Sequence, residues 1–366
     1  MNQLFRWDQM GLFLLALAAG ILPFAVPEVC AAALREGLTL CSGPLLLSLF
    51  PFLVVSRLLI QCPESDLLAL PFRLAAWGIG IRTPCAARVL CIGFLGGFAP
   101  AASAAAQAVR TGQLTAEEAD ALLPACICSG PSFVVLTVGQ SLLGSAELGV
   151  LLFASQITAN YLTAALLNRF AGVRSVKPGS AAPASPAPPR LDEILADAAI
   201  TYCKLCGFIL FFRMLAAGAG ALLPAGAGTL CAILLEVCSG CDLASRTGRW
   251  GSLLCCAALS VQGLSVLLQV RTICPPEMTL RPLYRARMLH LPLSLALFYL
   301  LLPGGEADVF STLPARVLLM RRDCALLVFA VCCMAACTLR SGIRQVEQKQ
   351  MARNAGGCCI NSKTLL

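Results

Sequence analysis

The chain has 366 residues, of which 58% are hydrophobic and 13% are charged, and it carries a formal net charge of +8. Soluble domains hold about one quarter charged residues, so this composition excludes an ordinary soluble domain. Apolar stretches of about 20 residues recur along the chain, which predicts an all-α, polytopic membrane protein in a lipid bilayer. Because basic residues near membrane segments set topology, the positive charge requires no nucleic-acid partner.

The apolar stretches predict membrane segments along the whole chain. In order, they cover residues 10–27, 38–60, 67–82, 86–106, 121–140, 147–168, 205–222, 227–245, 250–270, 288–303 and 323–339. The segment 67–82 contains Arg73 and a proline, and we expect it at the membrane interface. The N-terminal part, 1–37, is expected to hold a retained first span; a cleaved signal peptide is the alternative.

A stretch rich in proline, alanine and serine, 171–190, divides the chain into two halves. This composition predicts an extended linker that does not cross the membrane. An amphipathic pattern directly after it predicts a helix lying on the membrane surface. The expected organisation is a first half at 38–170, a second half at 191–303, a C-terminal span at 304–340 and a basic tail at 341–366.

Two connections are rich in basic residues, and the positive-inside rule places both in the cytoplasm. One is the linker 171–190 with its flanks, and the other is the connection 271–287. Their basic residues are Arg169, Arg174, Lys177 and Arg190 in the first, and Arg271, Arg281, Arg285 and Arg287 in the second.

Three pairs of short motifs occur in the same order in both halves, which predicts weak internal repeats. They are "LFPFLVVSRLL" (49–59) with "GFILFFRML" (207–215), "FLGGFAPAAS" (94–103) with "EVCSGCDLAS" (236–245), and "CICSGPSFVVLTVGQ" (126–140) with "ALSVQGLSVLLQV" (258–270). Low identity leaves a chance match of apolar segments as the alternative. Inverted repeats of this kind are common in transporters, whose binding sites lie where the repeats meet.

In the last two pairs, glycine, proline and polar residues interrupt apolar runs, which predicts four broken or re-entrant helices. Lipid cannot satisfy the freed backbone groups, so such breaks must face protein or a water-filled cavity. Simple kinks are the alternative at any one position. The residues expected to form a solute site at these breaks are Gly96, Gly97, Pro100, Ser129, Gly130, Pro131, Ser132, Glu236, Ser239, Gly240, Gln262 and Gly263.

Glu236 is the strongest of these candidates, because an ionisable residue within an apolar span costs at least ~2.5–3.5 kcal/mol on insertion. If a helix begins at Ala227, Glu236 lies about 13–14 Å along it, near the bilayer midplane. The helix break is expected just beyond, at Ser239 and Gly240. The carboxylate is then expected to line a central cavity; an interhelical hydrogen bond of purely structural value is the alternative.

The sequence offers little for catalysis or metal binding. Most of the 21 cysteines lie in apolar runs, where cysteine packs as a small hydrophobe. Two C-x-x-C pairs, Cys203/Cys206 and Cys238/Cys241, lack a second ligand pair, and His290 is the sole histidine in the chain. His290 is expected to face lipid or to cap a helix near the interface. We therefore expect no enzyme activity, no cofactor and no metal.

Five motifs together carry a family resemblance. They are "LFPFLVVSRLLI", "GFLGGFAPAASAAAQAVRTGQLTAEEADALLPACICSGPSFVV", "GFILFFRML", "LLEVCSGCDL" and "LSVQGLSVLLQV", between about residues 35 and 303. They resemble the YlbJ-like sporulation integral membrane proteins, part of the wider group with nucleoside-recognition Gate domains. The chain departs from the family pattern at Gly96–Pro100, where Ser-Gly-Tyr-Pro is expected, and it lacks the charged residue expected shortly afterwards.

The resemblance implies two Gate-type halves related to the concentrative nucleoside transporters. It also implies the mother-cell cytoplasmic membrane of an endospore-forming bacterium. The expected function is to move or sense a small polar solute, nucleoside-like by the family name. The alternative is a non-transporting scaffold for assembly of the spore envelope. A second copy of the chain and other sporulation membrane proteins remain open as partners.

Overall fold

The computed structural model describes residues 2–61, 63–171 and 190–302. Within these ranges the chain is helical and contains no β-strand, which confirms the predicted all-α fold. The expected C-terminal span, the basic tail and most of the linker lie outside the described residues.

The first half of the chain begins with three helices and continues as a series of shorter ones. These are α1 (Asn2–Ala25), α2 (Pro27–Ser42), α3 (Pro44–Gln61), the 3₁₀ turn η1 (Pro63–Asp66), α4 (Leu70–Gly78), α5 (Pro84–Gly96), α6 (Phe98–Arg110), α7 (Ala116–Cys126), the π-helix η2 (Ser132–Leu142) and α8 (Ala146–Ala171). The short α4 falls within the segment that was expected at the interface.

The second half repeats the pattern of long and broken helices. Its elements are α9 (Leu191–Leu222), α10 (Ala225–Leu235), α11 (Val237–Ser245), the 3₁₀ turn η3 (Gly248–Trp250), α12 (Gly251–Val261), α13 (Gly263–Ile273) and α14 (Arg281–Leu301). The expected surface helix and the following span are one continuous helix, α9. The expected basic connection is also shorter than predicted, because α14 already begins at Arg281.

The distribution of apolar and polar side chains between surface and interior is that of a membrane protein. Within the described ranges, four helical stretches are long and apolar enough to cross a bilayer: Pro27–Leu47, Ala146–Ala171, Leu191–Leu222 and Gly248–Ile273. Large apolar side chains such as Phe24, Phe170 and Leu300 are 89%, 81% and 77% exposed, whereas Gln156 and Asn160 are buried. Apolar side chains outside and satisfied polar side chains inside suit a lipid solvent.

The residue Ala171, where the linker begins, and the connection 274–280 lie on one side of the molecule. We call this side the linker face. Asp120, early in α7, accepts hydrogen bonds there from the backbone nitrogens of Thr279 and Leu280, at 2.8 and 3.1 Å. Ala171 borders the same groove as Thr279. Ala171, where the linker begins, and the connection 274–280 therefore lie on one side, as the positive-inside rule requires if both connections are cytoplasmic.

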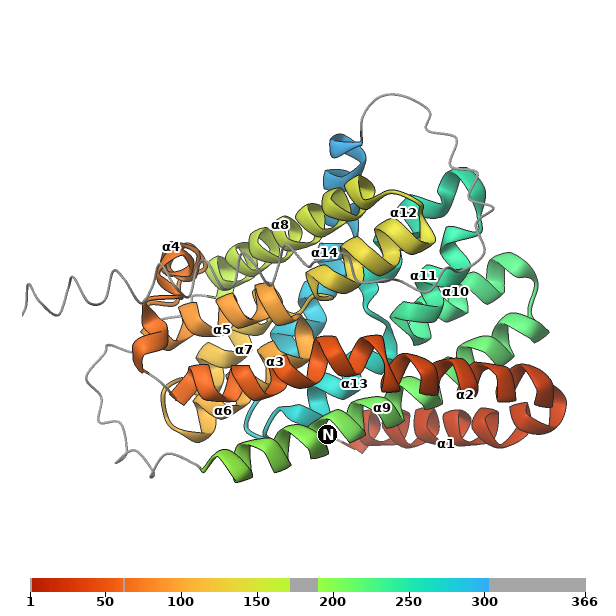
Figure 1. Ribbon diagram of the computed structural model, residues 1–366, viewed down its shortest axis with the longest axis horizontal. Coiled ribbons are helices and arrows are strands. Elements are labelled where there is room, and N and C mark those ends of the chain that lie inside the picture. The colour runs from red at the N-terminus through yellow and green to blue at the C-terminus, as the bar shows by residue number, and fades with distance from the viewer. Residues whose placement is uncertain (1, 62, 172–189, 303–366) are drawn as a thin grey trace, which may run out of the picture.

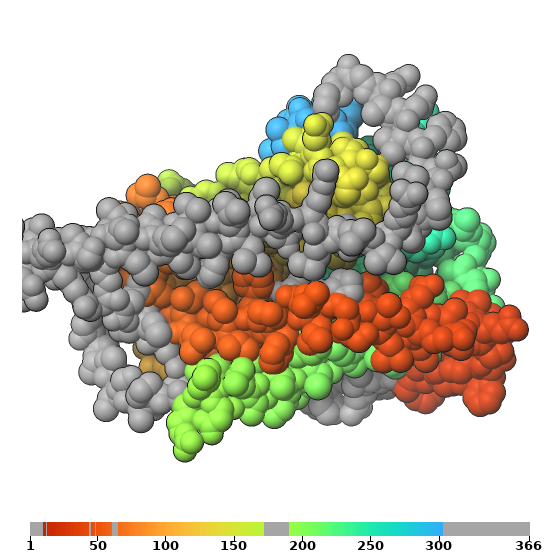
Figure 2. Space-filling model, viewed as in Figure 1, coloured from red at the N-terminus to blue at the C-terminus, as the bar shows by residue number. Residues whose placement is uncertain are grey.

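Long helices of the two halves run in opposite directions. In Figures 1 and 2, α9 lies along α2 and α3. Arg57 near the end of α3 pairs with Asp197 near the start of α9 at 2.6 Å, whereas Arg213 late in α9 pairs with Glu36 of α2 at 2.7 Å. The helices α8 and α14 also pack antiparallel, since α8 ends and α14 begins at the linker face.

The shorter helices complete this inversion. The pair α7 and η2 enters from the linker face, whereas α12 and α13 run towards it, because α13 ends directly before the connection 274–280. The long helices α3 and α9, and likewise α8 and α14, thus run in opposite directions, while η1 and α4 of the first half have no counterpart between α9 and α10. This arrangement places the breaks between consecutive short helices in the interior, where the candidate site residues lie.

Candidate functional site: two junctions of broken helices

The helices α5 and α6 form a re-entrant hairpin whose tip is Gly97. A Cβ atom on Gly93 of α5 would lie 3.2 Å from the Cβ of Ala101 in α6, a distance that a straight helix does not allow over eight residues. Gly97 has φ 80° and ψ −164°, a conformation open essentially to glycine alone. This glycine therefore allows the chain to reverse at the tip.

The hairpin tip packs against the break between α7 and η2. A Cβ atom on Gly97 would lie 2.7 Å from the backbone nitrogen of Gly130 and 3.2 Å from the carbonyl oxygen of Cys128. Only a glycine fits at that separation. We call this contact of Gly97 with Gly130 the first junction.

The second half builds the same arrangement from α10 and α11. A Cβ atom on Gly240 of α11 would lie 2.8 Å from the Cα of Ile233 in α10, so these helices also fold back on one another. The tip is Glu236, which has an extended backbone with φ −151° and ψ 126°. Its counterpart is Gly97, so the repeat alignment of 94–103 with 236–245 was displaced by three residues.

The expected break at Ser239 and Gly240 is wrong, because α11 continues through both residues. The reason lies in the side chain of Glu236. Its carboxylate accepts hydrogen bonds from the backbone nitrogens of Cys238 and Ser239, at 2.8 and 2.7 Å, and from the Ser239 hydroxyl at 2.9 Å. A carboxylate that caps the free N–H groups starts a new helix at once.

The tip at Glu236 meets the break between α12 and α13, and we call this contact the second junction. A Cβ atom on Gly263 would lie 2.9 Å from the backbone nitrogen of Glu236. Gln262 and Gly263 have positive φ values of 65° and 69°, which turn the chain out of α12 and into α13. The predicted break at these two residues is therefore confirmed.

Arg287 connects the two junctions, although the sequence places it in a basic connection and not among the candidate site residues. Its guanidinium donates to the carbonyl of Ile127, where α7 ends, at 2.8 Å, and to the carbonyl of Ser260, near the end of α12, at 3.3 Å. A third bond at 3.2 Å reaches the Asn160 side chain. The ends of α7 and α12 carry partial negative charge, which explains how they hold a buried cation.

A buried polar row on α14 positions this arginine. Arg287, His290 and Ser294 follow at helical spacing and are at most 7% exposed. The ring of His290 contacts the carbonyl of Gln156 at 3.2 Å, so the expected lipid-facing or capping role of His290 is wrong. Gln156 in turn donates to Ser260 of α12 at 3.0 Å. This polar spacing within an otherwise apolar helix is the sequence signal that could have identified Arg287.

The structure brings most of the predicted residues to the two junctions. Those buried in or directly beside the first junction are Gly96, Gly97, Pro100 and Ser129, with Gly130 half-buried. Those at the second junction are Glu236, Ser239, Gln262 and Gly263, while Gly240 serves hairpin packing. Pro131 is half-buried, and Ser132, which follows Gly130 by two residues, is exposed on η2.

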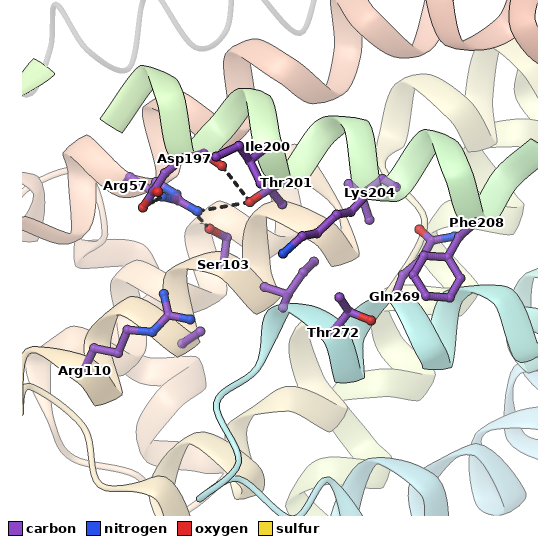
Figure 3. A pocket seen from close by; sticks show the side chains of 13 residues that line it. Arg57, Ser103, Arg110, Asp197, Ile200, Thr201, Lys204, Phe208, Gln269 and Thr272 are labelled. Atoms are coloured by element: carbon purple, nitrogen blue, oxygen red, sulfur yellow. Dashed lines mark hydrogen bonds and ion pairs between the residues drawn. The ribbon is translucent and has the colours of Figure 1, made fainter. Parts of the chain in front are cut away.

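Two buried glutamine oxygens have no hydrogen-bond partner among the described residues. They are the Oε1 atoms of Gln262 and Gln269, whose side chains are 1% and 2% exposed. Gln262 lies at the second junction, and Gln269 lies seven residues further along, within α13. Gln269 borders a cavity of about 150 Å³ between α3, α6, α9 and α13 (Figure 3). One unpaired acceptor therefore lies at the second junction and the other lies beside this cavity.

The described residues contain no group of three or more histidine, cysteine, aspartate or glutamate side chains that could hold a metal ion. No protein-family model, curated protein or solved structure matches the chain. The functional conclusion therefore depends on the geometry of the junctions and the cavity.

Proposed function

We propose that this membrane protein moves or senses a small polar solute at the interface between its two inverted halves. The supporting observation is the pairing of each re-entrant hairpin tip with the break of a neighbouring helix. Secondary transporters use discontinuous helices at a repeat interface to bind solutes and to alternate access. In line with the resemblance, the proposed setting is the cytoplasmic membrane of a sporulating bacterium, and a nucleoside-like compound is the first solute to test.

A second candidate is a scaffold for spore-envelope assembly, and one observation favours it. Among the described residues, the carboxylate of Glu236 accepts hydrogen bonds only from its own hairpin, and Glu236 is 2% exposed. A carboxylate occupied in this way stabilises a helix start and has less capacity to bind a solute. The two candidates differ in what the junction must do, since a scaffold requires only that it remains folded.

The test uses Gln262→Asn, because asparagine tolerates the left-handed backbone at this position and shortens the unpaired amide. Uptake of labelled nucleosides and of phosphate is measured in proteoliposomes, and heat-resistant spores are counted in a sporulating host that lacks its own copy. Transport or sensing predicts normal membrane levels with fewer resistant spores. Wild-type uptake of any test solute that falls at least tenfold in the variant supports transport.

Gln140→Asn is the matched control, since Gln140 is exposed near the end of η2, ten residues after Gly130. It should leave spores and uptake unchanged. Fully resistant spores from Gln262→Asn, together with no uptake by the wild type, would reject the solute hypothesis and favour the scaffold.

A further inference from the structure

The cavity of about 150 Å³ lies at the interface between the halves, on the linker-face side of the junctions. Two of its walls, α3 and α6, belong to the first half, and the other two, α9 and α13, belong to the second (Figure 3). An engineered protein cavity of this volume holds a molecule as large as benzene. The volume therefore suits a ligand of a few heavy atoms.

The cavity is lined by three cationic side chains and one carboxylate, so its charge favours an anion. Arg57 is 8% exposed and pairs with Asp197, whose own side chain is 64% exposed. Arg110 and Lys204 also line the cavity, and their charged ends point towards it in Figure 3. In the described parts of the chain no ion pair is recorded for either of these two residues.

The polar groups between the cations fit an oxyanion. Arg57 donates to the hydroxyls of Ser103 and Thr201, at 3.3 and 3.2 Å, which holds its guanidinium at the cavity wall. Thr272 lies on the opposite wall, where its hydroxyl donates to the carbonyl of Leu268 at 2.9 Å and is therefore not a free donor for the anion. Fixed donors around a positive pocket are the usual means of binding phosphate or carboxylate groups.

Gln269 adds a requirement that selects among oxyanions. Its Nε2 donates to Ser265 at 2.9 Å, while its buried Oε1 has no partner among the described residues. An unpaired buried acceptor costs about 1–3 kcal/mol, so a ligand that donates a hydrogen bond there is favoured. Phosphate near neutral pH still carries P–OH groups, whereas sulfate and the phosphodiester of a lipid carry no such proton.

We infer that this cavity binds phosphate as the free ion. Arg57, Arg110 and Lys204 bind its negative oxygens, and Gln269 accepts its proton-bearing hydroxyl. The inference rests on the proposed function, for which it names the solute class. It also places the phosphate where α6 and α13 meet, so that binding there depends on how the halves are arranged.

The test measures binding alone, by calorimetric titration of the purified full chain in lipid-free detergent near pH 7. Inorganic phosphate and sulfate are the two probes. Phosphate should bind at least tenfold more tightly than sulfate, and Gln269→Leu should remove that preference while sulfate affinity stays the same. Equal affinity of the wild type for both anions would overturn the inference.

Charge variants test the position of the site. The double variant Arg110→Gln with Lys204→Gln should weaken phosphate binding at least tenfold, and it should fold normally because both side chains are exposed. Arg249→Gln is the matched control, since Arg249 is exposed in η3, outside the cavity lining. An unchanged phosphate affinity in the double variant would also overturn the inference.

Two further experiments distinguish free phosphate from a lipid headgroup, and the phosphate inference from the proposed function. If nanodiscs with anionic phosphodiester lipids abolish phosphate binding that zwitterionic nanodiscs allow, a lipid headgroup occupies the cavity and the inference is wrong. If phosphate binds but proteoliposomes take up no solute and spores are unaffected, the inference holds and the proposed function fails. If proteoliposomes take up another solute but the protein does not bind phosphate, the proposed function holds and the inference fails.

Discussion

The first junction is made of backbone, whereas the second depends on a side chain. A Cβ atom on Gly97 would lie 2.7 Å from the backbone nitrogen of Gly130, so Gly97 leaves no room for a side chain at this contact. At the second junction, the Glu236 carboxylate caps α11 beside Gly263. Both solutions provide what a helix break inside a membrane protein needs, which is close packing and satisfied backbone groups. The two junctions therefore share the same geometry, whereas the groups that form them differ between the halves.

Arg287→Leu should have the largest effect, because Arg287 serves both junctions. The substitution leaves the carbonyls of Ile127 and Ser260 and the Asn160 side chain without this donor. We expect a loss of about 3 kcal/mol or more in the free energy of unfolding, measured by SDS titration of the purified protein. Arg285→Leu on the exposed side of α14 is the control and should change it by less than about 0.5 kcal/mol. Equal effects of the two variants would show that Arg287 holds neither junction.

Glu236→Leu should weaken the second junction alone. It leaves two buried backbone N–H groups, of Cys238 and Ser239, without their acceptor, at a cost of about 2–3 kcal/mol. Glu236→Gln keeps one acceptor oxygen and should cost roughly half as much. The same SDS titration measures both variants. If leucine and glutamine proved equally stable, the carboxylate would have no capping role.

Gly97→Ala should weaken the first junction alone, by about 2 kcal/mol. The new methyl group would meet the backbone of Gly130, in a backbone conformation that alanine adopts only with strain. Gly130→Ala is the matched control, because a Cβ atom there would lie 3.5 Å from the nearest atom, the carbonyl oxygen of Gly96. That variant should unfold within about 0.5 kcal/mol of the wild type. A similar loss in both glycine variants would contradict the described packing.

Ser132→Ala should have the smallest effect, although the sequence placed Ser132 in the site. The side chain is exposed on η2, so its removal should change the free energy of unfolding by less than about 0.5 kcal/mol. A loss above 1 kcal/mol would mean that η2 is packed differently around the first junction.

The sequence predicts the helix breaks well because glycine, proline and isolated polar residues are rare inside apolar spans. Gly97, Gly130 and Gln262 all lie at or beside real breaks. It misplaces the break near Glu236 because Gly240 suggests a helix breaker, whereas here the glycine allows two helices to pack. Glu236 acts as a cap through its own hairpin, which local composition does not reveal.

Long-range contacts account for what the sequence could not provide. Arg287 belongs to a run of basic residues that suggests an exposed connection, yet its partners lie 27 to 160 residues away in the chain. The cavity likewise combines four helices that only the fold brings together. The cavity has no local motif, and the polar spacing on α14 can mark Arg287 but does not reveal its partners, so both required the fold.

Sided labelling of two single cysteines tests that inverted arrangement most directly. Glu117→Cys lies at the linker face beside the first hairpin, and Arg249→Cys follows the second hairpin on the other side; both positions are exposed. In a cysteine-reduced variant, a membrane-impermeant maleimide applied to intact cells should label position 249 and spare position 117. Inverted vesicles should give the opposite result. Labelling of both positions from the same side would contradict the inverted repeat and, with it, the pairing of the two junctions.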